Sequence, residues 1–157
     1  MSVELLKTRR QLSVANTFSN DEVLLTIPMR PDMELAAAKL ASVIAESMSF
    51  NDDQIEEIQL AMIESCINAF EHSRSPDQSV VIQYIIRTNE LEFKITDQGI
   101  GFNPTNKSTR RTNQPDLHPD MRKRGWGLEI MNTLMDSVDI MSGENGTTIT
   151  MVKCKTA

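Results

Sequence analysis

The chain has 157 residues, 39% of them hydrophobic and 24% charged, which is enough for one domain with a hydrophobic core. Its net charge of -6 argues against nucleic-acid binding, which requires a basic surface. No segment approaches the roughly 18 consecutive apolar residues of a membrane span, and Met1–Asn20 lacks the apolar run of a signal peptide, so we expect a cytoplasmic protein without a membrane partner.

The first part of the chain predicts an arm, a strand and two helices. Residues 1–21 are polar and irregular, and form either a loose arm or a helix that needs a partner. Val23–Pro28 is typical of a short strand. Asp32–Ser49 and Asn51–Ser73 have apolar residues at helical spacing, and each begins with a residue type that caps helices.

The next segments favour a pair of strands and, much later, a third helix. Ser79–Arg87 is rich in residues that favour strands. Leu91–Thr96 alternates apolar with polar side chains, so we expect a half-buried strand that follows a short turn. A third helix is predicted at Arg124–Met135.

Two final strands complete the predicted fold. Ser137–Ser142 and Thr147–Lys153 form a hairpin, with the turn signal at Asn145–Gly146. The pattern predicts an α+β domain over residues 22–157, a two-layer sandwich of a mixed, largely antiparallel sheet with about three helices on one face.

Residues 102–124 interrupt this regular pattern. They include three prolines, and they carry six basic residues against two acidic ones in an otherwise acidic chain. Structureless loops of about 20 residues are uncommon and are usually functional lids or disordered inserts. The segment is therefore either a solvated loop or a lid suited to a small anion.

The helix at Asn51–Ser73 carries a narrow polar stripe. Its apolar residues cover an arc of about 200° on a helical wheel, whereas a surface helix usually has an apolar stripe nearer 100°. Glu64 and Asn68 lie one turn apart on the opposite side. Such oxygens are ligands for Mg²⁺, and a carboxylate can act as a general base. The stripe is either the solvated side of the helix or the wall of a cleft.

Two glycine-rich turns flank the lid. Asp97–Gly101 (DQGIG) follows a strand; glycine permits close approach of a ligand, and an ionised Asp97 can accept a hydrogen bond from an adenine amino group. Arg124–Leu128 (RGWGL) opens the third helix, whose free N–H groups suit phosphate. Neither turn is a Walker A loop or a dinucleotide fingerprint, and each alone could be an ordinary turn.

The cysteines and histidines do not form a recognisable site. Cys66 and Cys154 make neither a disulfide framework nor a metal-ligand cluster. His72 and His118 are too far apart in the sequence, and too poorly accompanied, to indicate a zinc site or a catalytic triad.

In this order, the motifs resemble those of the GHKL (Bergerat-fold) ATPases, and within them the bacterial anti-sigma factor serine/threonine kinases of the RsbW and SpoIIAB type. The resemblance rests on the segments 61–73 (AMIESCINAFEHS), 96–104 (TDQGIGFNP) and 124–138 (RGWGLEIMNTLMDSV), and on the hairpin residues 146–148. It covers about residues 23–152. It implies the Bergerat fold, ATP and Mg²⁺ as cofactors, and a homodimer.

The resemblance also implies a role for each matched residue. Glu64 would be the catalytic base, Asn68 would hold Mg²⁺ against the phosphates, and Asp97 would bind the adenine amino group. The residues implied to bind the nucleotide are Asn68, Asp97, Gly99, Gly101, Arg124, Gly125, Gly127, Leu128 and Thr148.

The function implied by the resemblance is that of an ATP-dependent serine/threonine protein kinase. Its substrate would be a STAS-domain anti-sigma factor antagonist, and a sigma factor would be a second partner. The alternative is a nucleotide-dependent protein-binding switch without kinase activity. A histidine-kinase catalytic domain would need a helix pair with an acceptor histidine, and a gyrase- or MutL-like ATPase would need a transducer domain; the sequence shows neither.

Overall fold

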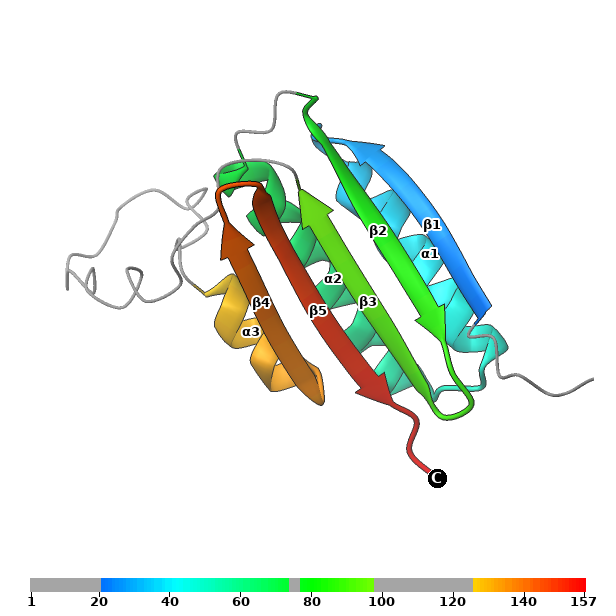
Figure 1. Cartoon of the computed structure of the whole chain (residues 1–157). Helices are drawn as coiled ribbons and strands as arrows, with labels where there is room; N and C mark the ends of the chain where they lie inside the picture. The colour runs from blue at the N-terminus through cyan, green and yellow to red at the C-terminus, as the bar shows by residue number, and fades with distance from the viewer. Residues whose placement is uncertain (1–20, 74–76, 98–125) are drawn as a thin grey trace, which may run out of the picture.

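The computed structural model describes residues 21–73, 77–97 and 126–157 (Figure 1). Every strand and helix predicted from the sequence is present. The elements are β1 (Asp21–Pro28), α1 (Met33–Ser47), α2 (Asp52–His72), β2 (Ser79–Ile86), β3 (Glu90–Asp97), α3 (Gly127–Leu134), β4 (Ser137–Gly143) and β5 (Gly146–Cys154). None of the helices within these ranges is long and apolar enough to cross a membrane.

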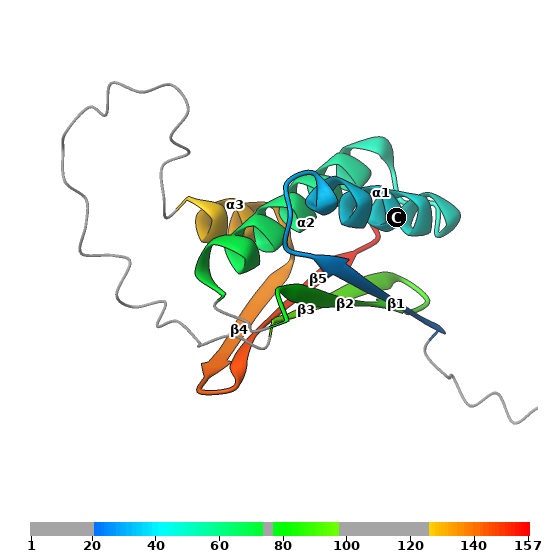
Figure 2. The ribbon, with the colours of Figure 1, turned by 90° about the horizontal axis from the view of Figure 1, so that it is seen from above.

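The strands form one five-stranded sheet in the order β1-β2-β3-β5-β4. All three helices cover the same face of this sheet, as Figure 2 shows. The predicted α+β two-layer architecture is therefore confirmed. All neighbouring pairs of these strands are antiparallel, so the described part of the sheet contains no parallel pair, although a mixed sheet was expected.

The hydrophobic core lies between the sheet and the helices. It is built from alternate residues of the central strands, because successive side chains of a strand point to opposite faces. The largest buried side chains of these strands are Val80, Ile82, Tyr84, Leu91, Phe93, Ile95, Ile149 and Met151. The rings of Tyr84 and Phe93 meet edge to face with centroids 5.8 Å apart, and the Tyr84 hydroxyl donates to the Ala37 carbonyl at 3.0 Å, which joins β2 to α1.

The two predicted helix caps differ in the structure. Asn51 caps α2, and its side-chain oxygen accepts a hydrogen bond from the Gln54 amide at 2.9 Å. Asp32 precedes α1 as predicted, but its backbone is left-handed (φ 71°) and its side chain makes no capping hydrogen bond. The local sequence therefore placed both helix starts correctly but only one of the two capping interactions.

The β4–β5 hairpin turns where the sequence predicts it, between Ser142 and Thr147, and each strand is one residue longer than expected at the turn. Gly143 pairs with Gly146, so the connecting residues are Glu144 and Asn145. The positive φ falls on Gly146 (121°), where a side chain would be strained.

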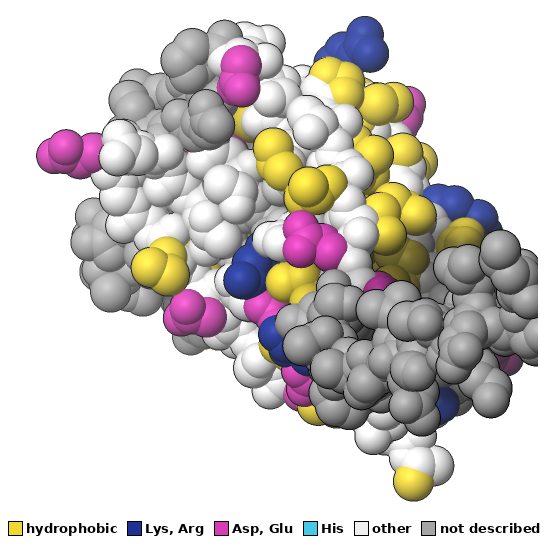
Figure 3. Space-filling model, turned by 45° about the vertical axis from the view of Figure 1, so that its right-hand side comes forward, with side chains coloured by type: hydrophobic (Ala, Val, Ile, Leu, Met, Phe, Trp, Pro, Cys, Tyr) yellow, Lys and Arg dark blue, Asp and Glu magenta, His cyan; other side chains and the backbone are white. Residues whose placement is uncertain are grey.

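Several apolar side chains of β1, β2 and α1 are exposed. Leu24 of β1 and Val81 of β2 lie on the face of the sheet that the helices leave open, and Leu35 and Val43 lie on α1 in the helix layer. Figure 3 shows that hydrophobic side chains gather on part of the surface that this view brings forward. Gathered apolar side chains of this kind suit an interface with another protein.

Candidate functional site

The predicted site residues that the structure describes come from α2, β3, α3 and β5. They are Glu64, Asn68, Asp97, Gly127, Leu128 and Thr148. The predicted residues Gly99, Gly101, Arg124 and Gly125 lie outside the described residues, as does the predicted lid at 102–124. Residues 1–20 of the predicted arm also lie outside them, and Asp21 is the first residue of β1.

Helix α2 lies between α1 and α3, above the sheet (Figure 2). Asn68 is only 7% exposed, and Ala61 on the same side of α2 is fully buried, whereas Glu71 near the end of the helix is exposed. The middle of the polar stripe is therefore covered in the structure, and its C-terminal end is solvated. Leu60, predicted to be covered, is 42% exposed instead. The difference arises because α3 packs on the stripe, and a helical wheel cannot show where a neighbouring helix will lie.

The beginning of α3 contacts Glu64 of α2. A Cβ atom added to Gly127 would lie 3.4 Å from Glu64 Oε2 and 4.0 Å from the Glu64 carbonyl oxygen. The N-terminus of α3 therefore packs close to this carboxylate, with room for a methyl group but for little more. A helix N-terminus carries partial positive charge, which favours a neighbouring negative group. Glu64 and Gly127 come from motifs that are far apart in the sequence and were predicted to belong to one site, and the structure brings them together.

Asp97 lies at the end of β3, on the face of the sheet that the helices cover. It follows Leu91, Phe93 and Ile95 at every second position, and it is only 6% exposed. Thr147 is its direct partner in β5 and is also buried. A buried carboxylate needs hydrogen-bond donors, so this end of the strand pair is a polar location within an otherwise apolar layer.

Thr148 is placed differently from the sequence prediction. It pairs with Thr96, and the two hydroxyl oxygens lie 3.1 Å apart. Residues next to each other in a strand face opposite sides, so Thr148 points away from the face that Asp97 and Thr147 share. The alternation in β5, with Ile149 buried, was the signal that favoured Thr147 for this face.

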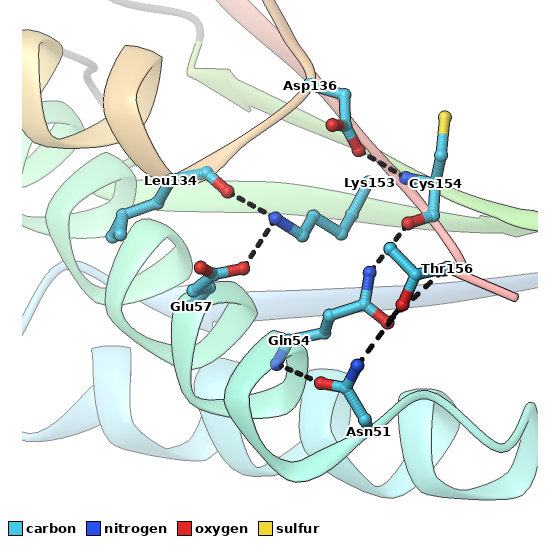
Figure 4. A network of polar contacts seen from close by, with 8 residues as sticks. All are labelled: Asn51, Gln54, Glu57, Leu134, Asp136, Lys153, Cys154 and Thr156. Atoms are coloured by element: carbon cyan, nitrogen blue, oxygen red, sulfur yellow. Dashed lines mark hydrogen bonds and ion pairs between the residues drawn. The ribbon is translucent and has the colours of Figure 1, made fainter.

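A second polar cluster, shown in Figure 4, lies at the other end of α2 and α3. Lys153 of β5 is 8% exposed, and its ammonium group donates to the Leu134 carbonyl at 2.6 Å. The same group lies 2.5 Å from Glu57 Oε2 on α2. Lys153 has no motif around it, but its position two residues after the buried Met151 places it on the inner face of β5.

The end of β5 is also fastened to the beginning of α2. Gln54 Nε2 donates to the Cys154 carbonyl at 2.8 Å, and Asn51 Nδ2 donates to Thr156 Oγ1 at 3.2 Å. Across β5, Asp136 accepts a hydrogen bond from the Cys154 amide at 2.6 Å. These contacts make the second polar cluster a junction of α2, β5 and the end of α3 with the residue that precedes β4 (Figure 4).

The described cysteines offer no support for thiol chemistry at the site. Cys66 is fully buried on α2, and desolvation by burial, with a smaller effect of Glu34, raises its pKa to about 12. Its thiol therefore stays protonated at neutral pH, and a protonated thiol is a poor nucleophile.

Substitutions at Gly127 test the close approach of α3 to Glu64. Gly127→Ala should be neutral or slightly stabilising, because its Cβ makes an ordinary contact and alanine favours helix. Gly127→Leu should lower the free energy of unfolding by about 1–3 kcal/mol, because the added atoms would overpack the space beside the carboxylate. Urea unfolding followed by circular dichroism measures both effects.

Gly143→Leu is the matched control for that experiment. A Cβ atom at Gly143 meets nothing within 4 Å, so the same added volume should change the free energy of unfolding by no more than about 0.5 kcal/mol. An equal loss of stability in both leucine variants would contradict the close packing at Gly127.

Comparison with known families gives a match over most of the chain. Residues 27–153 match the family model described as a histidine kinase-like ATPase domain. The matched region runs from the end of β1 into β5 and so includes α2, Asp97 and α3.

Individual relatives and a solved structure are similar over the same region. The serine-protein kinase RsbW of Bacillus velezensis is 30% identical over 145 residues, which cover 86% of this chain and 86% of that protein. The protein of the same name from Bacillus subtilis is 29% identical over 143 residues, covering 85% of each. The crystal structure of the RsbU and RsbW domains of Rv1364c from Mycobacterium tuberculosis superimposes with a TM-score of 0.64 at 18% identity. That match covers 86% of this chain and 32% of the mycobacterial chain, and it supports the fold alone.

Proposed function

This chain belongs to the histidine kinase-like ATPase domain family and is a protein kinase, and from that premise we propose that it phosphorylates serine or threonine in another protein. One observation carries the proposal: Glu64 lies against the N-terminus of α3 at Gly127, with the buried Asn68 one turn away. Phosphates bind at helix N-termini, so a carboxylate there is close to both the phosphoryl donor and an incoming hydroxyl.

Glu64 is assigned the role of general base. It would take the proton from the acceptor hydroxyl as that oxygen attacks the γ-phosphorus of ATP. The bond between the γ-phosphorus and the bridging oxygen then breaks, and ADP leaves. Phosphoryl transfer depends mainly on positioning and charge neutralisation, so one base that is held against the phosphate-binding helix suits this reaction.

Asn68 is assigned to Mg²⁺. Its carboxamide oxygen is the kind of ligand that Mg²⁺ takes, and the burial of Asn68 one helical turn after Glu64 supports the assignment. Mg²⁺ usually keeps substrate phosphates among its ligands, so one protein oxygen can be a sufficient contribution. When bound, the ion neutralises charge on the phosphates.

Asp97 is assigned to the adenine end of ATP, with Gly99 and Gly101 shaping the pocket as the resemblance implies. The burial of Asp97 supports this assignment, because a buried acceptor discriminates strongly between ligands that can and cannot donate to it. We add Thr147, which shares the face of Asp97, and leave Thr148 out of the side-chain contacts. Arg124, Gly125, Gly127 and Leu128 complete the proposed phosphate-binding turn.

The proposed acceptor is a STAS-domain anti-sigma factor antagonist, and a sigma factor is the proposed second partner. The name serine-protein kinase, carried by the Bacillus relatives, supports a protein as the substrate. A cytoplasmic location belongs to the same proposal, because ATP and the transcription machinery are found there.

A homodimer is also proposed. The exposed apolar residues Leu24, Leu35 and Val43 supply surface that an interface would cover. Sedimentation equilibrium should give twice the monomer mass of 17.7 kDa, and a monomer at micromolar concentration would contradict the proposal.

Incubation with Mg-ATP and candidate antagonists tests the kinase proposal directly. We expect phosphate on one serine or threonine of the cognate antagonist, detected by mass spectrometry of the acceptor. ATP binding and partner capture without any transfer would instead favour the switch without kinase activity. Failure to bind ATP would contradict both functions.

A further inference from the structure

Helices α2 and α3 lie side by side in opposite directions. The first residue of α3, Gly127, contacts Glu64, and its last residue, Leu134, is joined to Glu57 through Lys153. Gly127 and Leu134 are seven positions apart on α3, and Glu57 and Glu64 are seven positions apart on α2. Seven residues span about 10 Å along a helix. The beginning of α3 therefore lies against Glu64 of α2, and the end of α3 is held near Glu57 of α2 by Lys153.

Helix α3 depends on contacts from outside itself. It has eight residues, and helices this short are not stable alone. Trp126 at its N-cap makes no capping side-chain hydrogen bond, and its last turn contains no basic residue. Lys153 supplies the positive charge at the C-terminus of α3 from a different element, where a cation stabilises the free carbonyl groups.

We propose that Lys153 is a positioning residue for ATP binding, acting through the phosphate-binding end of α3. Its ammonium group joins the final carbonyl of α3 to Glu57 of α2, and this contact sets where the other end of α3 stands relative to Glu64. The inference rests on the proposed function, in which that other end binds the phosphates. Lys153 itself touches no substrate, because it lies about one helix length away from Gly127.

Trp126 provides a readout of this coupling that needs no nucleotide. It is the only tryptophan in the chain, it is 54% exposed, and it lies at the end of α3 opposite to Lys153. In Lys153→Met, which keeps the aliphatic stem but removes the charge, we expect the acrylamide quenching constant of Trp126 to change at least about twofold. Lys155→Met removes the same charge two residues later and should leave quenching unchanged.

The functional readout is the separation of KM from kcat. For Lys153→Met, KM for ATP should rise about tenfold while kcat at saturating ATP stays within about twofold, because phosphate binding is impaired and the base is retained. Glu57→Gln keeps the bond to Leu134 and should raise KM less than about threefold. Lys153→Arg retains a cation and should restore most of the affinity if its longer group reaches the same carbonyl.

The outcomes separate positioning from simple stabilisation. A lower melting temperature in Lys153→Met with unchanged Trp126 quenching and unchanged KM would overturn the inference. If Lys153→Met does not fold, Lys153→Gln, which also removes the charge but keeps a polar group at this position, takes its place with the same two readouts and the same expected changes. If the wild-type protein does not bind ATP, the proposed function fails, and Trp126 quenching still shows whether Lys153 controls the far end of α3.

Discussion

Replacing Glu64 by glutamine should reduce phosphoryl transfer by about 10²–10⁴-fold while ATP binding persists. Glutamine keeps the shape of the side chain beside Gly127 but cannot accept the proton of the acceptor hydroxyl at neutral pH. The measurements are the initial rate of acceptor phosphorylation and the dissociation constant for Mg-ATP, which should stay within about threefold of the wild-type value.

Glu71→Gln is the matched control for this substitution. Glu71 lies two turns later on the same helix and is exposed, so its loss of charge should leave the transfer rate within about twofold. A Glu64→Gln protein that retains more than about a tenth of the wild-type rate would show that another group is the base. Unchanged Trp126 fluorescence would confirm that α3 keeps its position in the variant.

Replacing Asp97 by asparagine should weaken ATP binding by about 10–100-fold. This factor corresponds to the roughly 1.5–3 kcal/mol that a hydrogen bond to a charged group contributes. The preference for ATP over GTP should narrow at the same time, because guanine presents a carbonyl group where adenine presents its amino group and an ionised Asp97 can only accept. Calorimetric titration with each nucleotide measures both changes.

Asp139→Asn is the control for the loss of a strand carboxylate. Asp139 is exposed on the edge strand β4, so its replacement should leave nucleotide affinity and selectivity unchanged. Equal affinities for ATP in wild-type and Asp97→Asn protein would remove Asp97 from the nucleotide site. Urea unfolding of both variants should accompany the titrations, since Asp97 also has protein contacts.

The sequence predicted the elements well because their signals are local. Alternation along Leu91–Thr96 and the capping residue Asn51 depend on neighbours within a few positions, and both are confirmed. The order of strands is a different matter. β5 lies between β3 and β4, and this placement depends on contacts between segments that are far apart in the sequence.

The candidate site likewise combines features with a local sequence signal and contacts between distant segments that have none. Glu64 and Asn68 could be assigned to one polar stripe from their spacing, but only the packing of α3 on α2 shows that Asn68 is buried while Leu60 is exposed. Thr147 and Lys153 were accessible from the alternation in β5, since both fall on the same face as Ile149. Their partners could not be predicted, because Asp97 and Glu57 come from elements with no local signal for the pairing.

The position of β5 between β3 and β4 has a consequence for how the chain is made. During synthesis, β1, β2 and β3 can pair as soon as they emerge from the ribosome, but β4 has no partner until β5 follows it. Until then one edge of β3 has no hydrogen-bonded partner strand. Lys153, which binds the last carbonyl of α3, is also still missing. Incomplete chains of this kind expose unpaired strand edges and aggregate easily. A nascent protein should therefore remain a chaperone client until β5 has emerged and paired with β3 and β4, and only then acquire the geometry of its site.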